Sequence, residues 1–141
     1  MPVPLIVGFS EAARVLDENK EAEALRLKIL RDALLNGLNQ APSIQVFGNL
    51  DDSHPGNLHL AIENVDSMQL LNNVQPHIAF SLGSACDGLN REYSPIMKAL
   101  GVPKNTAECA FRICVGRMTT VEEIHSAIEI IVAEVKRLKL L

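Results

Sequence analysis

The sequence predicts an α/β protein of the α+β type, with a small, mainly antiparallel sheet and helices packed on it. Two observations support this class. Apolar residues follow a helical period near both ends of the chain. Four short runs of strand-forming residues lie between these ends, which gives the predicted order α-β-β-α-β-α-β-α. A chain of 141 residues is one domain by size, so residues 1–141 are expected to form a single domain.

The first helix is predicted over residues 5–39, with a bend or break near residues 17–19. One row of its apolar residues recurs at steps of four (Leu25, Ile29 and Ala33). A second row widens this apolar stripe (Leu27, Leu30, Leu34 and Leu38). Pro42 closes the helix because proline cannot continue it.

Four short strands are predicted over residues 44–47, 57–62, 78–80 and 110–115. Apolar residues alternate with others in the second run, which is the period of a strand (Leu58, Leu60 and Ile62). The fourth run has an apolar face (Phe111, Ile113 and Val115) and a mixed face (Ala110, Arg112 and Cys114).

Three further helices are predicted after the second strand. Asp66 can cap a short helix that runs to about residue 73. Residues 95–100 form another, ended by Gly101. A capping box over residues 120–123 opens the last helix, which has one long apolar stripe (Val121, Ile124, Ile128, Ile131, Val135 and Leu138).

The composition excludes several classes of function. The net charge of −4 argues against a nucleic-acid-binding surface. No run of about 18 apolar residues exists, so neither a membrane span nor a membrane partner is expected. The N-terminus lacks a basic region before its apolar stretch, so no secretory signal is expected. Three cysteines without a Cys-x-x-Cys pair indicate reduced thiols and a cytoplasmic location.

The histidines do not form a metal-binding pattern. Their spacing matches no common metal site (His54, His59, His77 and His125). All four are therefore expected at the surface or with their hydrogen bonds satisfied.

The segment around Cys86 is the first candidate site. Small residues precede this cysteine (Ser81, Gly83, Ser84 and Ala85), and a polar loop of about ten residues follows the strand. A lone cysteine is often an inert, packed thiol. Asp87 beside it disfavours the thiolate, and no histidine or lysine lies within four residues. Activation of Cys86 would have to come from elsewhere in the fold or from a bound substrate.

Arg112 is the second candidate, because it interrupts an apolar strand. Its planar guanidinium can bind a carboxylate with two parallel hydrogen bonds. It can equally form a structural salt bridge or lie in solvent. Cys109 and Cys114 are predicted to be packing residues, although Cys114 shares the strand face of Arg112.

Residues 81–86, Ser-Leu-Gly-Ser-Ala-Cys, closely resemble the Ser-Ser-Gly-Ser-Ala-Cys signature of class I cysteine desulfurases. These pyridoxal-phosphate enzymes of the class V aminotransferase family remove sulfur from L-cysteine. Four other segments resemble the same family, namely residues 4–9, 55–58, 93–101 and 111–120. The resemblance implies the C-terminal, small domain of such an enzyme, with the fold of that domain.

The resemblance also implies what this chain lacks. The large domain binds pyridoxal phosphate through a lysine in a Ser-x-His-Lys context. None of the six lysines stands in that context (Lys20, Lys28, Lys98, Lys104, Lys136 and Lys139). The isolated chain is therefore expected to be inactive and to hold no cofactor, because the large domain is absent.

The resemblance assigns roles to three residues. Cys86 would attack the substrate sulfur and carry it as a persulfide, leaving L-alanine. Arg112 would hold the α-carboxylate of L-cysteine, and Asn57 would lie near the substrate. The implied partners are a sulfur-acceptor protein, in iron–sulfur cluster or thio-cofactor biosynthesis, and a second copy of the full-length enzyme. Two alternatives stay open: a non-enzymatic persulfide-carrying or binding module, and a relative of selenocysteine lyase.

Overall fold

A computed structural model describes residues 1–41, 43–82 and 93–140. The described elements follow the order α1 (Val3–Leu38), β1 (Ile44–Val46), β2 (Asn57–Ile62), α2 (Ser67–Val74), β3 (Ser81–Leu82), α3 (Pro95–Ala99), α4 (Lys104–Glu108), β4 (Ala110–Cys114) and α5 (Val121–Lys139). The strands form one antiparallel sheet in the order β1-β2-β4-β3. The predicted fold class is confirmed.

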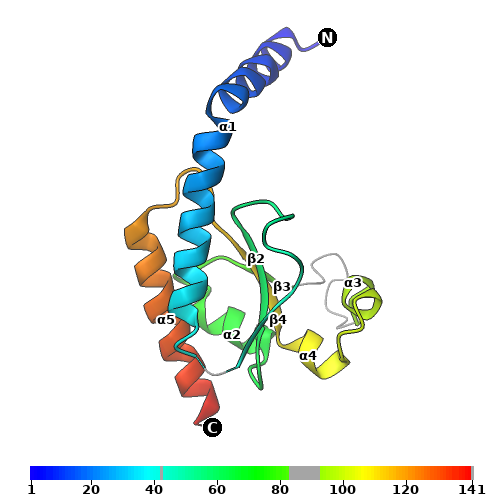
Figure 1. Cartoon of the computed structure of the whole chain (residues 1–141), viewed down its shortest axis with the longest axis vertical. Helices are drawn as coiled ribbons and strands as arrows, with labels where there is room; N and C mark the ends of the chain where they lie inside the picture. The colour runs from blue at the N-terminus through cyan, green and yellow to red at the C-terminus, as the bar shows by residue number, and fades with distance from the viewer. Residues whose placement is uncertain (42, 83–92, 141) are drawn as a thin grey trace.

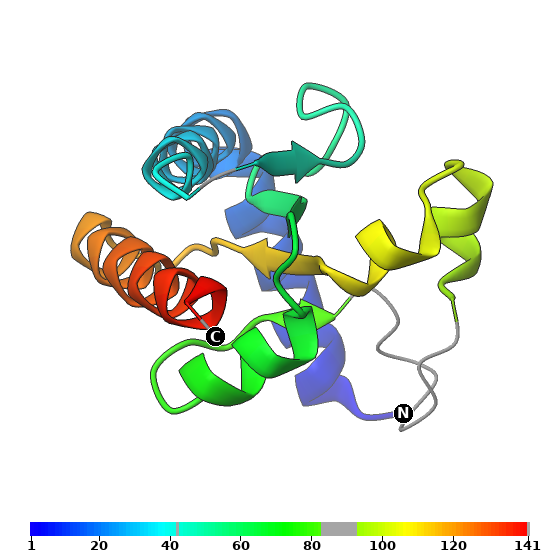
Figure 2. The same ribbon diagram turned by 90° about the horizontal axis from the view of Figure 1, so that it is seen from below.

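One face of the sheet packs against α1, α2 and α5, while α3 and α4 lie on the other side (Figures 1 and 2). The alternation of the strands explains this layering. Leu58 and Leu60 of β2 and Phe111 of β4 are fully buried against the helices. Burying each such side chain contributes about 1.5–3 kcal/mol. This face therefore carries the main core.

A smaller apolar cluster lies on the opposite face. Phe47, Ala61, Met97, Val102 and Ala110 form it, where α3 and α4 approach the sheet. The cluster covers only the end of the sheet near Ala61 and Ala110, which face each other across β2 and β4. The other end of this face has no described helix against it.

Two connecting elements differ from the sequence prediction. The third strand is Ser81–Leu82, not residues 78–80, because Ser81 pairs with Arg112 and Leu82 with Phe111. Residues 78–80 instead lead away from α2, and the Phe80 ring packs 4.7 Å from that of Phe111. The helix α4 was not predicted, since its five residues are too few to show an apolar period.

The helix α1 is continuous and bends without breaking (Figure 1). Its buried residues begin only at Leu27 and follow the second row of leucines. The row of the predicted apolar stripe that contains Leu25 and Ile29 does not face the core, since both residues are about 60% exposed (62% and 59%). The N-terminal half projects from the rest of the chain with several apolar side chains exposed (Val3, Leu5, Val7, Phe9 and Leu16). No helix in the described ranges is long and apolar enough to cross a membrane.

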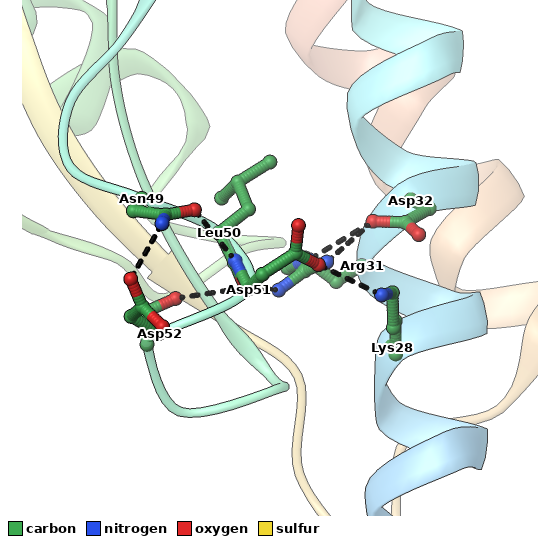
Figure 3. A network of polar contacts seen from close by, with 8 residues as sticks. Lys28, Arg31, Asp32, Asn49, Leu50, Asp51 and Asp52 are labelled. Carbon is green, nitrogen blue, oxygen red and sulfur yellow. Dashed lines mark hydrogen bonds and ion pairs between the residues drawn. The ribbon is translucent and has the colours of Figure 1, made fainter.

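A buried arginine fixes the β1–β2 connection to α1 (Figure 3). Arg31 is 1% exposed and donates a hydrogen bond of 2.8 Å to the carbonyl oxygen of Leu50. Its other donors bind the carboxylate of Asp32, at 3.0 and 2.8 Å. Outside this buried contact, Lys28 forms an exposed ion pair of 2.9 Å with Asp51. The connection is thus anchored by one buried cation and one exposed cation.

The helix α5 begins as predicted. The Thr120 hydroxyl accepts from the Glu123 amide at 3.2 Å, and the Glu123 carboxylate accepts from the Thr120 amide at 2.9 Å. At α2, the predicted cap is also present, because the Asp66 carboxylate accepts from the Gln69 amide at 2.9 Å.

Candidate functional site

The open end of the second sheet face brings together polar side chains from three strands. Strand register places Asn57 opposite Cys114, and Arg112 between His59 on one side and Ser81 on the other. Directly paired residues point to the same side of a sheet. Asn57, His59, Ser81, Arg112 and Cys114 therefore share this face, which we call the polar face.

The sequence builds the polar face by alternation. In β4, Phe111 and Ile113 are buried against the helices, so Arg112 and Cys114 turn outward and are exposed. In β2, His59 lies between the buried residues Leu58 and Leu60. The predicted faces of the fourth strand are confirmed.

Gly56 allows β2 to approach the end of β4. A Cβ atom at this position would lie 2.3 Å from the carbonyl oxygen of Val115, a contact that no side chain can make. The Val115 amide donates to the Gly56 carbonyl at 2.8 Å. Asn57, the next residue, is thereby held beside Cys114. This close approach is the reason for a glycine here.

Arg112 lies on an inner strand, yet its side chain is exposed. Among the described residues, its guanidinium makes no hydrogen bond or ion pair. The structural salt bridge considered from the sequence is thus not found in that part of the chain. A guanidinium in this state can bind a planar anion with two parallel hydrogen bonds.

Asn57 and Cys114 are in contact. The Cys114 thiol lies 3.3 Å from the side-chain carbonyl oxygen of Asn57. Cys114 is exposed, so its prediction as a packing residue is wrong. Cys109 is half-buried against the smaller apolar cluster, as predicted, and burial raises the pKa of its thiol.

His59 is the residue of the polar face that the sequence analysis missed. Its ring packs against Phe47, with the ring centroids 5.3 Å apart. Its Nε2 atom is buried and has no hydrogen-bond partner in the described structure. Burial, and secondarily the charge of Arg112, lower the pKa of His59. The expectation of a surface or satisfied histidine is wrong here. The available signal was strand alternation, because His59 is two residues from Asn57 in β2 and therefore lies on the same face of the sheet.

A second missed residue is Arg26, which holds the turn after β4. Its guanidinium donates to the carbonyl oxygens of Gly116, Arg117 and Thr119, at 3.1, 2.8 and 2.9 Å. The same side chain binds Glu23 in α1. One arginine thus ties α1 to the connection between β4 and α5. Its position in a helix otherwise rich in ordinary surface charges gave no signal for this contact.

Cys86, the predicted nucleophile, lies outside the described residues, together with the rest of its predicted loop. Within the described ranges, no group of three or more histidine, cysteine or acidic residues could hold a metal ion. The six lysines of the chain are all described and all exposed. None belongs to the polar face.

No family model matches the chain. Its sequence is 38% identical over 139 residues to the cysteine desulfurase IscS of Actinobacillus succinogenes. That alignment covers 99% of this chain and 34% of the relative. The IscS of Ehrlichia chaffeensis is 36% identical over 140 residues, again over 99% of this chain and 34% of the relative. The segment that this chain matches is the C-terminal part of these relatives.

Solved structures agree with this assignment. A NifS-like protein matches with a TM-score of 0.81 and 25% identity, over 100% of this chain and 35% of that protein. A NifS-like protein from Rickettsia africae has a TM-score of 0.79 at 24% identity, over 94% of this chain and 34% of that protein, and supports the fold. The predicted resemblance to cysteine desulfurases is confirmed. The chain spans about a third of the length of these relatives.

Proposed function

We propose that this chain is the substrate-binding and sulfur-accepting part of a cysteine desulfurase. The complete enzyme would convert L-cysteine to L-alanine and leave a persulfide on Cys86. The observation that carries this proposal is the exposed guanidinium of Arg112 on the polar face, without a described partner. The similarity to cysteine desulfurases supplies the reaction.

Arg112 would bind the α-carboxylate of the substrate. Two parallel hydrogen bonds fix both the position and the orientation of a carboxylate. Asn57 lies on the same face, two residues along β2 from His59, the partner of Arg112. Its side-chain amide can bind a second polar group of the substrate. The polar face would thus orient an amino acid without reacting with it.

The residues of this chain do not fit a role in holding pyridoxal phosphate, the cofactor that the family implies. All six lysines are exposed. Lys20, Lys28 and Lys104 are paired with neighbouring carboxylates. The cofactor would therefore be bound by polypeptide corresponding to the two thirds of the relatives that this chain does not match.

Cys86 would accept the sulfur. In the net reaction the carbon–sulfur bond of L-cysteine breaks, its carbon gains hydrogen to become alanine, and a sulfur–sulfur bond forms on Cys86. A sulfur-acceptor protein in the cytoplasm would then take the persulfide sulfur. The complete enzyme would act as a homodimer.

A chimera tests this proposal. The C-terminal third of the Actinobacillus succinogenes relative is replaced by this chain, and alanine formation from L-cysteine is measured with pyridoxal phosphate and a thiol reductant. We expect activity that Cys86→Ser abolishes and that Cys109→Ser, a change outside the polar face, preserves. A chimera that binds the cofactor, as its absorbance shows, yet forms no alanine would contradict the proposal. Selenocysteine in the same assay distinguishes a desulfurase from a selenocysteine lyase.

One alternative is a module that carries a persulfide made elsewhere, because no lysine that could hold the cofactor lies among the described residues of the polar face. Such a module would gain a sulfur atom on Cys86 when it is mixed with an intact cysteine desulfurase and L-cysteine. A chimera that contains such a module would form no alanine from L-cysteine. Mass spectrometry of Cys86 in both experiments separates the two functions.

A further inference from the structure

We propose that His59 and Arg112 act together as one carboxylate site on the polar face, in which the imidazole takes up a proton as the carboxylate binds. This inference rests on the proposed function, because it assumes that Arg112 binds the substrate carboxylate. It adds a positioning residue to the site, and it makes substrate binding depend on pH.

The geometry of the sheet is the first support. His59 and Arg112 are direct cross-strand partners in the antiparallel pair of β2 and β4. The Cβ atoms of such a pair lie about 4.5–5.5 Å apart, which is close enough for the two side chains to interact. Phe47 packs on the imidazole, so the ring cannot turn away freely.

The unsatisfied Nε2 atom is the second support. A buried polar atom without a hydrogen-bond partner is energetically unfavourable. A protonated imidazole carries N–H groups on both ring nitrogens and needs an acceptor for each. A carboxylate held by Arg112 has four lone pairs and would supply the acceptor that the described residues lack.

The charges around His59 decide the direction of the coupling. Of the described residues on the polar face, Arg112 alone carries a charge at neutral pH. Around Phe47, α3 and α4 contribute apolar side chains, with Tyr93 and Cys109 as the titratable groups of that cluster. Without a ligand, the positive guanidinium disfavours a second positive charge on His59. A bound carboxylate cancels this repulsion and favours protonation.

The coupling is reciprocal. If the carboxylate makes protonation of His59 easier, protonation of His59 must strengthen carboxylate binding by the same factor. Binding would therefore tighten as the pH falls through the titration range of His59. Where the shift is about one pH unit, the affinity for the carboxylate changes about tenfold.

NMR of the imidazole rings in this 141-residue chain provides the test. The four histidines are titrated from pH 5 to 8 with and without L-alanine, which has the substrate carboxylate but no thiol, at matched ionic strength. His54, His77 and His125 are exposed and serve as internal controls. Ethylamine hydrochloride, which lacks the carboxylate, is the matched ligand control. We expect L-alanine to raise the titration midpoint of His59 by about one pH unit and to leave the other midpoints unchanged.

Two variants sharpen the result. Arg112→Gln should raise the midpoint of His59 without ligand and remove its response to L-alanine. His59→Gln should make the affinity for L-alanine independent of pH between 5 and 7. If L-alanine shifts the Arg112 side-chain signal but not the His59 midpoint, this inference is wrong and the proposed role of Arg112 stands. If it shifts neither, Arg112 does not bind the carboxylate in this chain, and both statements fall.

Discussion

Gly37 of α1 faces Ile128 of α5 so closely that a Cβ atom on Gly37 would lie 2.3 Å from the Cδ1 atom of Ile128. The two helices therefore pack at a distance that only glycine allows at this position. Gly37→Ala gains helix propensity of about 1 kcal/mol but forces Ile128 to move, which costs about 1–3 kcal/mol. We expect a net loss of stability in urea denaturation.

Gly8→Ala is the matched control for this substitution. Gly8 lies in the same helix, and a Cβ atom there would meet nothing within 4 Å. Without the clash, the gain in helix propensity remains, so Gly8→Ala should leave stability unchanged or raise it slightly. Equal effects of the two substitutions would show that the contact with Ile128 is unimportant.

The second prediction concerns the two cations that anchor the β1–β2 connection (Figure 3). Arg31→Ala removes the 2.8 Å hydrogen bond to the carbonyl oxygen of Leu50, which keeps the longer 3.3 Å bond from the Ser53 hydroxyl, and it creates a cavity, so it should cost about 2–4 kcal/mol. Lys28→Ala removes only the exposed pair with Asp51 and should cost less than about 1 kcal/mol. Thermal or urea unfolding of both variants checks the ranking. Comparable losses would contradict the anchoring role of Arg31.

The third prediction follows from the lowered pKa of His59. As the pH falls below about 6.5, the unfolded chain takes up a proton on His59 before the folded chain does. The free energy of unfolding should therefore decrease with falling pH until the folded-state pKa is passed, and then level off for this group.

His59→Gln should remove this part of the pH dependence. The slopes of unfolding free energy against pH in the two proteins can differ by at most the effect of one proton, which is about 1.4 kcal/mol per pH unit. Urea unfolding at pH 5, 6 and 7 measures the slope for each. The predicted role of His59 would be wrong if His59→Gln made the stability more sensitive to acid, or left the slope of unfolding free energy against pH unchanged.

The fourth prediction compares the two described thiols. Burial raises the pKa of Cys109 and reduces its reactive thiolate, while Cys114 is exposed. In a Cys86→Ser background, we expect iodoacetamide to modify Cys114 at least about tenfold faster than Cys109 near pH 7.5. Peptide mapping by mass spectrometry gives both rates. Faster modification of Cys109 would mean that its environment is misassigned.

Strand alternation made much of the site predictable. The pattern around Arg112 predicted that its side chain lies on the other face of the strand from Phe111 and Ile113, and the structure agrees. Which residues of β4 lie beside Asn57 and His59 depends on the register between β2 and β4, and local sequence does not determine that register. His59 was therefore missed as a neighbour of Arg112. The role of Cys86 stays a prediction, because this residue lies outside the described ranges.

The errors in the fold have similar causes. Residues 78–80 carry strand-forming side chains, yet only Ser81 and Leu82 reach β4, because pairing is set by the sheet and not by local propensity. In α1, Leu25 and Ile29 fit the helical period as well as the buried leucines do. Which row faces the core depends on where the sheet and α5 lie.

The projecting half of α1 has a consequence for hydrogen exchange. Residues 3–14 of this helix are all exposed, so these twelve residues are supported mainly by their own backbone hydrogen bonds. An isolated helix of this length is marginal in water. Amide protons of residues 7–14 should therefore exchange by local fraying, orders of magnitude faster than those of residues 30–38. One continuous helix would thus contain two regions with separate opening free energies.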